Sequence, residues 1–242
     1  MSTERHTITV GDLKVDVVRK AIKNLHVGVY PPDGHVRVAT PLQLDDEAVR
    51  LAVISRLAWI KRQRAAFQAQ ERQSAREFVT GESHYVRGHR YLLNVIREEA
   101  PPRVVVRNAT TLDLYVRSGS DRDKREQVVL DWYRAQLKEA IPPLIAHWGE
   151  ALGVDVAAWG VKRMKTKWGS CTPDARRIWL NLELIKKPPA CLEYIVVHEM
   201  AHLIERTHND AFVALMDRHL PQWRLLRDQL NAAPLAHAEW GY

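Results

Sequence analysis

Apolar and polar residues alternate through the first 40 residues, which predicts a small β-sheet at the start of the chain. The alternation across 6–21 is interrupted once by a Gly-Asp pair, the pattern of a β-hairpin. Two more extended segments are predicted at 25–29 and 35–39, and the Pro-Pro-Asp-Gly run at 31–34 supplies the turn between them. The N-terminal part is therefore expected to be rich in β-structure.

The next stretch has helical periodicity. Apolar residues recur every three or four positions without glycine or proline, and Asp45 precedes them as a candidate N-cap, so one long helix is predicted over 45–73. Its other face is basic, which suits either a phosphate backbone or ordinary exposure to solvent; without interleaved aromatic residues the nucleic-acid interpretation is the weaker one. The basic side chains are Arg56, Lys61, Arg62, Arg64, Arg72 and Arg76.

Short strands are predicted between 78 and 116, because glycine and proline residues divide this stretch into brief apolar runs. The break around Gly119 ends the strand pattern. We expect a soft boundary there, with a β-rich N-terminal part over 1–119 that contains the long helix, and a second part over 120–242.

Helical periodicity returns after this break. Asp121 is placed to cap a helix that runs to Pro142-Pro143, and a further one or two turns are predicted over 144–152, ended by Gly153. Because proline disrupts a helix interior, a division into two helices is expected here.

Two strands are predicted next. The first leads into Trp168, Gly169, Ser170 and Cys171, and the second follows from the alternation of 178–184, which includes Asn181. If one strand borders a cleft, its free backbone groups can pair with an extended peptide, and Gly169 permits a close approach of that backbone. These four residues and Asn181 are the candidate substrate-binding residues.

The most informative motif is His-Glu-x-x-His, formed by His198, Glu199 and His202 among apolar residues at helical spacing. Residues four apart on a helix project from the same face, so both imidazoles can reach one divalent metal ion. His208, six residues further on, is a candidate third ligand. The alternative is an accidental grouping on a buried helix in a chain with 11 histidines; it is less favoured, because polar side chains have no other reason to enter so apolar a segment.

Three neutral imidazoles leave the fourth position of zinc open to water, whereas a structural zinc site is closed by four protein ligands. The ion lowers the pKa of that water to about 7, and Glu199 stands beside the metal as the base that takes its proton. Tyr194, about one turn before His198, is a candidate for holding the oxyanion. Cys171 is either a small buried apolar side chain or a thiolate able to block the open position.

The chain resembles the YgjP-like metallopeptidases, relatives of the SprT and Wss1 proteases, from about residue 25 to about residue 230. The resemblance implies a zincin-like catalytic part, both parts of the chain forming one YgjP-like unit, with zinc ligands His198, His202 and His208 and with Glu199 as catalytic acid/base. Glu205 stands where metzincins carry a turn glycine, so the chain departs from that group. The resemblance is carried by Trp168–Cys171, by 178–185, and by His198–Leu203 with His208 and Phe212 after it.

The residues after the motif predict further helices. Thr207-His208-Asn209-Asp210 resembles a capping box, so Thr207 is expected to cap a helix whose first residue is His208. Pro221 is expected to start another helix, and the segment from about Ala233 is expected to be a loosely packed end. Together the patterns predict an α+β protein with a small antiparallel sheet and the histidine motif on a helix.

Composition limits the size class and the cellular compartment expected for this protein. The 242 residues, 46% of them hydrophobic, suffice for one large domain or two small ones, and no apolar run approaches a membrane span. The N-terminus lacks a signal pattern, and Cys171 and Cys191 are too few for a disulfide framework, so a cytoplasmic protein without membrane contact is expected. The net charge of +7 favours polyanions only modestly.

Three functions remain open. The leading one is a zinc-dependent peptidase acting on extended or unfolded polypeptides. The second is a metal-dependent hydrolase of nucleotide phosphoanhydrides, with Lys165, Lys167 and Arg176 binding phosphate. The third is a nucleic-acid-associated protein with structural zinc, against which the open set of three imidazoles argues. No glycine-rich phosphate loop occurs.

Overall fold

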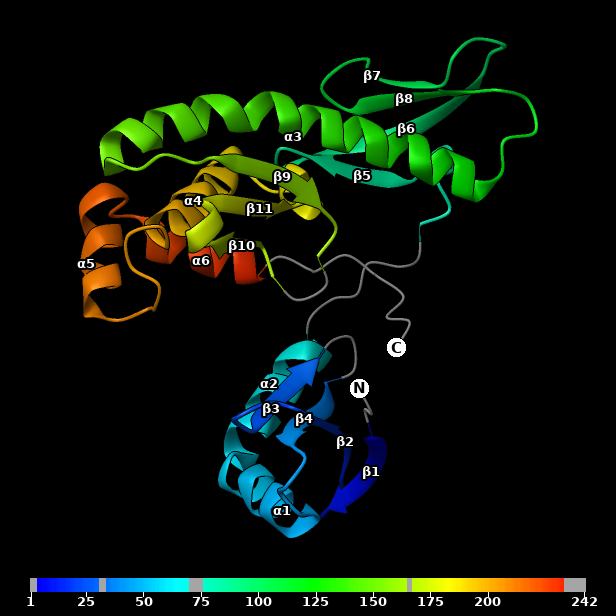
Figure 1. Cartoon of the computed structure of the whole chain (residues 1–242). Coiled ribbons are helices and arrows are strands. Elements are labelled where there is room, and N and C mark those ends of the chain that lie inside the picture. The colour runs from blue at the N-terminus through cyan, green and yellow to red at the C-terminus, as the bar shows by residue number, and fades with distance from the viewer. Residues whose placement is uncertain (1–3, 31–33, 70–75, 165–166, 233–242) are drawn as a thin grey trace. The chain divides into compact units, whose positions relative to one another are not determined.

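The computed structural model shows a mixed α/β protein, as predicted, with three small sheets and six α-helices in the part of the chain that it describes (Figure 1). The chain divides into two compact units, one up to residue 73 and one over residues 74–233. The boundary expected near Gly119 falls inside the second unit. No helix in the described part is long and apolar enough to cross a membrane. The described residues are 4–30, 34–69, 76–164 and 167–232.

The first unit is a four-stranded sheet with two helices. The predicted hairpin is confirmed as an antiparallel pair, β1 with β2, and the two later segments pair antiparallel as β3 with β4, while β2 and β4 are parallel. The turn expected between the later segments falls largely on 31–33, outside the described residues. In the order β1-β2-β4-β3, the strands are β1 (Glu4–Val10), β2 (Leu13–Lys20), β4 (His35–Pro41) and β3 (His26–Tyr30).

The structure has two helices where one was predicted over 45–73: α1 (Asp46–Ser55) and α2 (Leu57–Ala69), separated at Arg56. Asp45 is the N-cap, as predicted, and accepts a hydrogen bond from the Ala48 amide at 2.8 Å. The sheet explains the break, because α1 packs against the edge strand β1 and α2 against the opposite edge strand β3. Neighbouring strands of a sheet are rotated by roughly 20°, so a straight helix cannot follow both edges. Residues 70–73 lie outside the described part.

The second unit begins with the predicted short strands, which form a sheet in the order β5-β6-β8-β7. Figure 1 shows the long helix α3 (Arg122–Leu152) running past this sheet and on past strand β9 (Ala158–Lys162). Its buried side chains join the core between the elements. The strands are β5 (Ser83–Val86), β6 (His89–Arg97), β7 (Arg103–Val106) and β8 (Thr111–Val116).

Helix α3 continues through Pro142 and Pro143, so the predicted division into two helices is wrong, whereas the caps Asp121 and Gly153 are confirmed. Each proline removes one hydrogen bond of the helix, at a cost of about 3 kcal/mol. Both prolines face solvent, while the side chains of Ile141 before them and Trp148 after them are buried. Packing on both sides of the interruption thus holds the helix together.

A three-stranded sheet leads to the histidine motif. β10 (Gly169–Thr172) and β11 (Arg177–Asn181) pair antiparallel, as predicted, and β9 adds in parallel, giving the order β10-β11-β9 with β10 at an edge. The sheet is therefore mixed, and the prediction of a small antiparallel sheet is wrong in this respect. The second strand was predicted to reach residue 184 but ends at Asn181, before a 3₁₀ turn over Leu182–Lys186. The side chain of Asn181 accepts a hydrogen bond from the Glu183 amide at 3.2 Å, which starts the turn.

Three helices complete the unit: α4 (Pro189–Ala201), α5 (Asp210–His219) and α6 (Trp223–Ala232). The last begins two residues after Pro221, where its start was expected, and the segment from Ala233 lies outside the described residues. The tip of the β5–β6 hairpin supports the start of α4, because Gly88 lies against Pro188 so closely that an added Cβ would stand 3.1 Å from it. Helix α4 thus contacts both sheets of this unit: the β5–β6 hairpin at its start, and strands β10 and β11.

Candidate metal centre

Helix α4 brings two imidazoles to one face. His198 lies in its last turn and His202 directly follows it with helical backbone angles, so the spacing of four residues sets the ring centroids 4.9 Å apart. The helix around them is apolar and buried, and Val196, Val197 and Met200 have no exposed surface. Polar ring atoms in such surroundings need a partner, which a metal ion can be.

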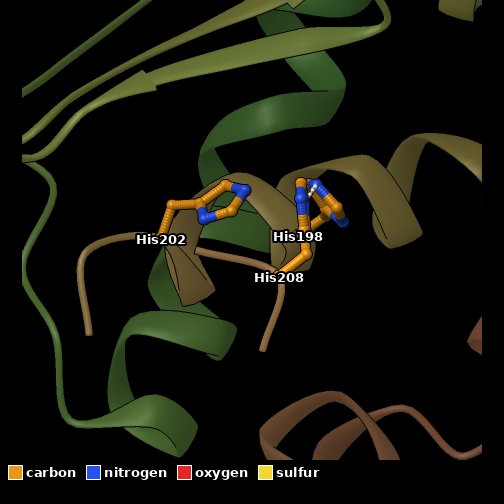
Figure 2. Close-up of side chains that lie close together, drawn as sticks. All are labelled: His198, His202 and His208. Atoms are coloured by element: carbon orange, nitrogen blue, oxygen red, sulfur yellow. Dashed lines mark hydrogen bonds between the residues drawn. The ribbon is translucent and has the colours of Figure 1, made fainter. Parts of the chain in front are cut away.

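His208 reaches the same point from the loop after α4. Its Nε2 atom lies 3.1 Å from Nε2 of His198, and its ring centroid lies 4.7 Å from that of His202. One ligand nitrogen from each of the three rings lies within 4.8 Å of the others, and Figure 2 shows the rings converging. The buried ring of Phe212, in α5, contacts all three imidazoles and so packs against one side of the histidine group.

The protonation of the rings suits a metal. Nδ1 of His202 donates a hydrogen bond to the Glu205 carbonyl at 3.0 Å, which leaves Nε2 as the free ligand atom. Burial lowers the pKa of His198 to about 3, with the neighbouring His202 and His208 adding to the effect, so this imidazole is neutral at pH 7. Its Nδ1 atom is buried and has no hydrogen-bond partner in the described part of the chain. Neutral imidazoles are the form that binds divalent metals.

Glu205 shapes the loop that carries His208. Its carboxylate accepts hydrogen bonds from the amide and hydroxyl of Thr207, at 3.2 and 3.1 Å. The prediction that Thr207 caps the next helix is therefore wrong: Asn209 is the cap of α5 and accepts from the Phe212 amide at 3.0 Å. Because α5 begins at Asp210 after this cap, His208 stands in the loop rather than at the helix start.

Glu199 lies beside the triad and is only 5% exposed. It faces Gly169 of β10, where an added Cβ would stand 2.4 Å from its Oε1 atom. The sequence predicted that Gly169 allows a close approach, and the structure shows that the approaching group is Glu199. Burial raises the pKa of Glu199 to about 8, against the opposing charge of Lys167.

A cleft of about 530 Å³ opens over this group. Trp168, Gly169, Ser170 and Cys171 all line it along the edge strand β10, whereas Asn181 does not. The opposite wall comes from α4, α6 and the loop between His202 and His208. Its lining residues there include Tyr194, Ile195, Arg206, Arg227 and Leu230.

Comparison with known families agrees with this geometry. The model of the YgjP-like metallopeptidase domain matches residues 23–233. The chain belongs to this family. Among solved structures, the metallopeptidase zymogen abylysin of Pyrococcus abyssi matches with 20% identity and a TM-score of 0.34, over 36% of this chain and 89% of that one. A comparison with curated proteins returned no match.

Within the YgjP-like domain, Asn181 acts as a clamp on the loop before β10. Its side-chain nitrogen donates to the carbonyl oxygens of Met164 and Lys167, at 2.9 and 2.8 Å, and its oxygen accepts from the Met164 amide at 3.3 Å. The loop that leads into Trp168 is thereby tied to β11. Asn181 therefore supports the wall of the cleft without lining the cleft itself.

Cys171 was given two interpretations, and its thiol is half-buried in the wall of the cleft. Burial and the charge of Glu199 raise the pKa of this thiol to about 11. Among the described residues, the group of converging ligand atoms contains the three histidines and no sulfur.

Two residues of this site were missed by the sequence analysis. Glu205 was noted only as a replacement for glycine, although a carboxylate two residues before Thr207 is a recognisable turn signal. Arg227 gave no local signal, because it reaches the cleft from α6, almost thirty residues past the motif.

Of the predicted phosphate-binding residues, Lys167 lines the cleft, Arg176 pairs with Asp155 at 3.0 Å, and Lys165 lies outside the described residues.

Proposed function

We propose that this protein is a zinc-dependent peptidase that cleaves polypeptides in an extended conformation. The observation that carries the proposal is the meeting of three histidines with the buried carboxyl group of Glu199 beside an edge strand. Three histidine ligands leave one position of zinc open, as in catalytic sites. A structural zinc ion would need a fourth ligand, and the converging group in the described residues contains none.

Zinc bound here would supply Lewis acidity, which polarises a carbonyl group and allows a water molecule to lose a proton near neutral pH. The charge of a bound metal would favour the ionised form of Glu199 over the burial that raises its pKa, so its carboxylate can accept that proton and then donate it to the leaving amine nitrogen. Glu205 holds His202 in one tautomer through its carbonyl oxygen. The hydroxyl of Tyr194, in the same cleft, donates a hydrogen bond to the developing oxyanion.

Substrate binds along β10 as an additional strand. The outer edge of β10 offers backbone N–H and C=O groups, and its residues line the cleft beside Glu199. Recognition by backbone hydrogen bonds depends little on side chains, so many sequences are accepted. Unfolded proteins are therefore cleaved faster than folded ones, because a folded protein rarely offers a free extended segment.

Metal analysis and digestion of an unfolded casein-like protein test this function. Glu199→Gln is expected to abolish hydrolysis and to keep about one equivalent of zinc, because the carboxylate acts on water and is not a ligand. His202→Ala is expected to lose the metal itself. Loss of zinc from Glu199→Gln would contradict the assigned role. Hydrolysis of nucleoside triphosphates without any peptide cleavage would favour the phosphoanhydride interpretation instead.

A further inference from the structure

The cleft over the histidines is lined by cations. Lys167, Arg206 and Arg227 contribute to its walls from three separate segments of the chain. The carboxylate among the lining residues is that of Glu199, which the proposed reaction already uses. A bound divalent metal would add further positive charge. The cleft therefore presents a positive field to any chain that enters it.

The guanidinium group of Arg227 lies at the end of a row of aromatic rings. Its Cζ atom lies 5.2 Å from the ring centre of Trp223, which is 7% exposed. Trp223 stacks on Tyr194 with 6.4 Å between centroids, and Tyr194 meets the edge of His198 at 5.8 Å. This row of rings runs from Arg227 to the metal ligand His198, and the Arg227 side chain is 46% exposed, so a bound chain can reach it.

Arg224, one turn earlier on α6, is a natural comparison. It lies over the same ring, with Cζ 4.5 Å from the centroid, but its two terminal nitrogens bind both carboxylate oxygens of Asp217. It does not line the cleft. Its hydrogen-bonding capacity is therefore already used.

Arg227 keeps donors for a ligand. Its Nε and one terminal nitrogen share a single oxygen of the adjacent Asp228, each at 3.1 Å. Within the described residues, the second terminal nitrogen makes no hydrogen bond. A guanidinium presents five N–H donors in a planar arrangement that matches a carboxylate, and Arg227 uses only part of it.

The other two cations differ in their availability. Arg206 forms an ion pair with Asp174, just beyond the end of β10, so its charge is largely compensated. Lys167 has no ion pair in the described part of the chain, and its charge acts on Glu199. Lys167 thus influences the proposed base directly, whereas the charge of Arg227 acts on Tyr194 and not on Glu199. Arg227 is therefore the better residue for a test of substrate choice, because Lys167 also affects Glu199.

We propose that Arg227 is a specificity-determining residue that binds a carboxylate of the polypeptide substrate, so that the enzyme prefers acidic segments. The inference rests on the proposed peptidase function and names its substrate class. The carboxylate belongs either to an aspartate or glutamate side chain near the scissile bond or to the C-terminus of the substrate chain. Both sources present the same planar anion to the guanidinium.

Matched fluorogenic peptides separate these sources. One pair has an amidated C-terminus and differs by Glu or Gln near the cleaved bond, and a second pair is neutral and differs by a free or amidated C-terminus close to that bond. We expect kcat/KM to be about fivefold higher for the carboxylate member of one pair, the size of a partly exposed charge pair, and to fall toward equality as salt is added. Which pair shows the difference identifies the source.

The variant Arg227→Gln is expected to reduce this ratio to near one. Arg224→Gln is the matched control, since it removes the same charge from the same helix and the same aromatic ring, and it is expected to leave the ratio as in the wild type. Thermal denaturation of both variants checks that α6 stays folded. Equal rates for both members of both pairs in the wild type, or an equal effect of the two substitutions, would overturn the inference.

Binding separates this inference from the peptidase function itself. Zinc-loaded Glu199→Gln protein is titrated with the same labelled peptides, and the change in anisotropy gives their affinities without any hydrolysis. Tighter binding of the carboxylate peptide, lost in the Glu199→Gln, Arg227→Gln double variant, supports carboxylate recognition even if no peptide is cleaved by the wild type. Equal affinities would refute it whatever the wild-type enzyme hydrolyses.

Discussion

Replacing Gly169 by alanine tests whether Glu199 must stand where the structure places it. The added Cβ would lie 2.4 Å from Oε1, 2.7 Å from Cγ and 2.8 Å from Cδ of Glu199. The backbone of Gly169 has no positive φ angle, so alanine itself fits the strand. The collision is therefore with the carboxyl group and not with the conformation of β10.

The size of the effect follows from the distance. Ordinary contact between such atoms begins near 3.4 Å, so the Glu199 carboxyl group has to retreat by about 1 Å. A misplacement of this size at a reacting group costs roughly 100-fold in rate, or about 3 kcal/mol in the activation free energy. The accompanying loss of folding stability is about 1–3 kcal/mol, as for other overpacked sites.

The assay compares kcat/KM on an unfolded substrate, zinc content and thermal stability. Gly160→Ala is the matched control, because a Cβ there would stand 2.4 Å from the Trp179 ring in the same sheet. Trp179 points away from α4, since its neighbours Ile178 and Leu180 are the buried side chains of β11. Gly160→Ala is expected to lose similar stability and to keep its rate within about twofold.

The outcome decides between two views of Glu199. A large loss of rate in Gly169→Ala with zinc retained, set against an active Gly160→Ala, agrees with a positioned base. Near wild-type cleavage by Gly169→Ala would refute the reasoning, because a carboxyl group displaced by about 1 Å should not act as before. Equal losses in both variants would assign the effect to folding.

Three further predictions concern the surroundings of the site. Glu205→Ala should weaken zinc binding about tenfold in competition with a chelator, because the loop that carries His208 loses its brace. Burial lowers the pKa of His84 to about 3, even though its Nε2 atom lies 3.1 Å from a carboxylate oxygen of Glu82, so wild-type stability should fall as the pH drops from 6.5 towards 3. His84→Leu should flatten this dependence and the exposed control His89→Leu should not, as measured by urea unfolding. Asn181→Ala should raise KM and increase proteolytic nicking between residues 163 and 168, whereas unchanged values would show that the clamp is dispensable.

Features that depend on neighbours along the chain could be predicted from the amino-acid sequence. A spacing of four residues on an apolar helix was enough to predict that His198 and His202 share a face, and the ring geometry agrees. The N-terminal hairpin and the caps Asp45 and Asp121 were predictable for the same reason. Each rests on hydrogen bonds or side-chain directions that span only a few residues.

The remaining features could not be predicted, because they depend on contacts between residues far apart in the sequence. Helix α3 continues through two prolines because buried side chains on both sides of them pack in the core. The helix propensity of the local sequence does not include that packing. Gly169 has its role through Glu199, thirty residues later, and Arg227 reaches the cleft only because α6 packs on α4. Even the cap of α5 differs from the prediction: Asn209 accepts from the Phe212 amide, and the Thr207 hydroxyl donates to Glu205 instead. A sequence pattern lists the candidates for such contacts, but the free energy of the folded chain selects among them.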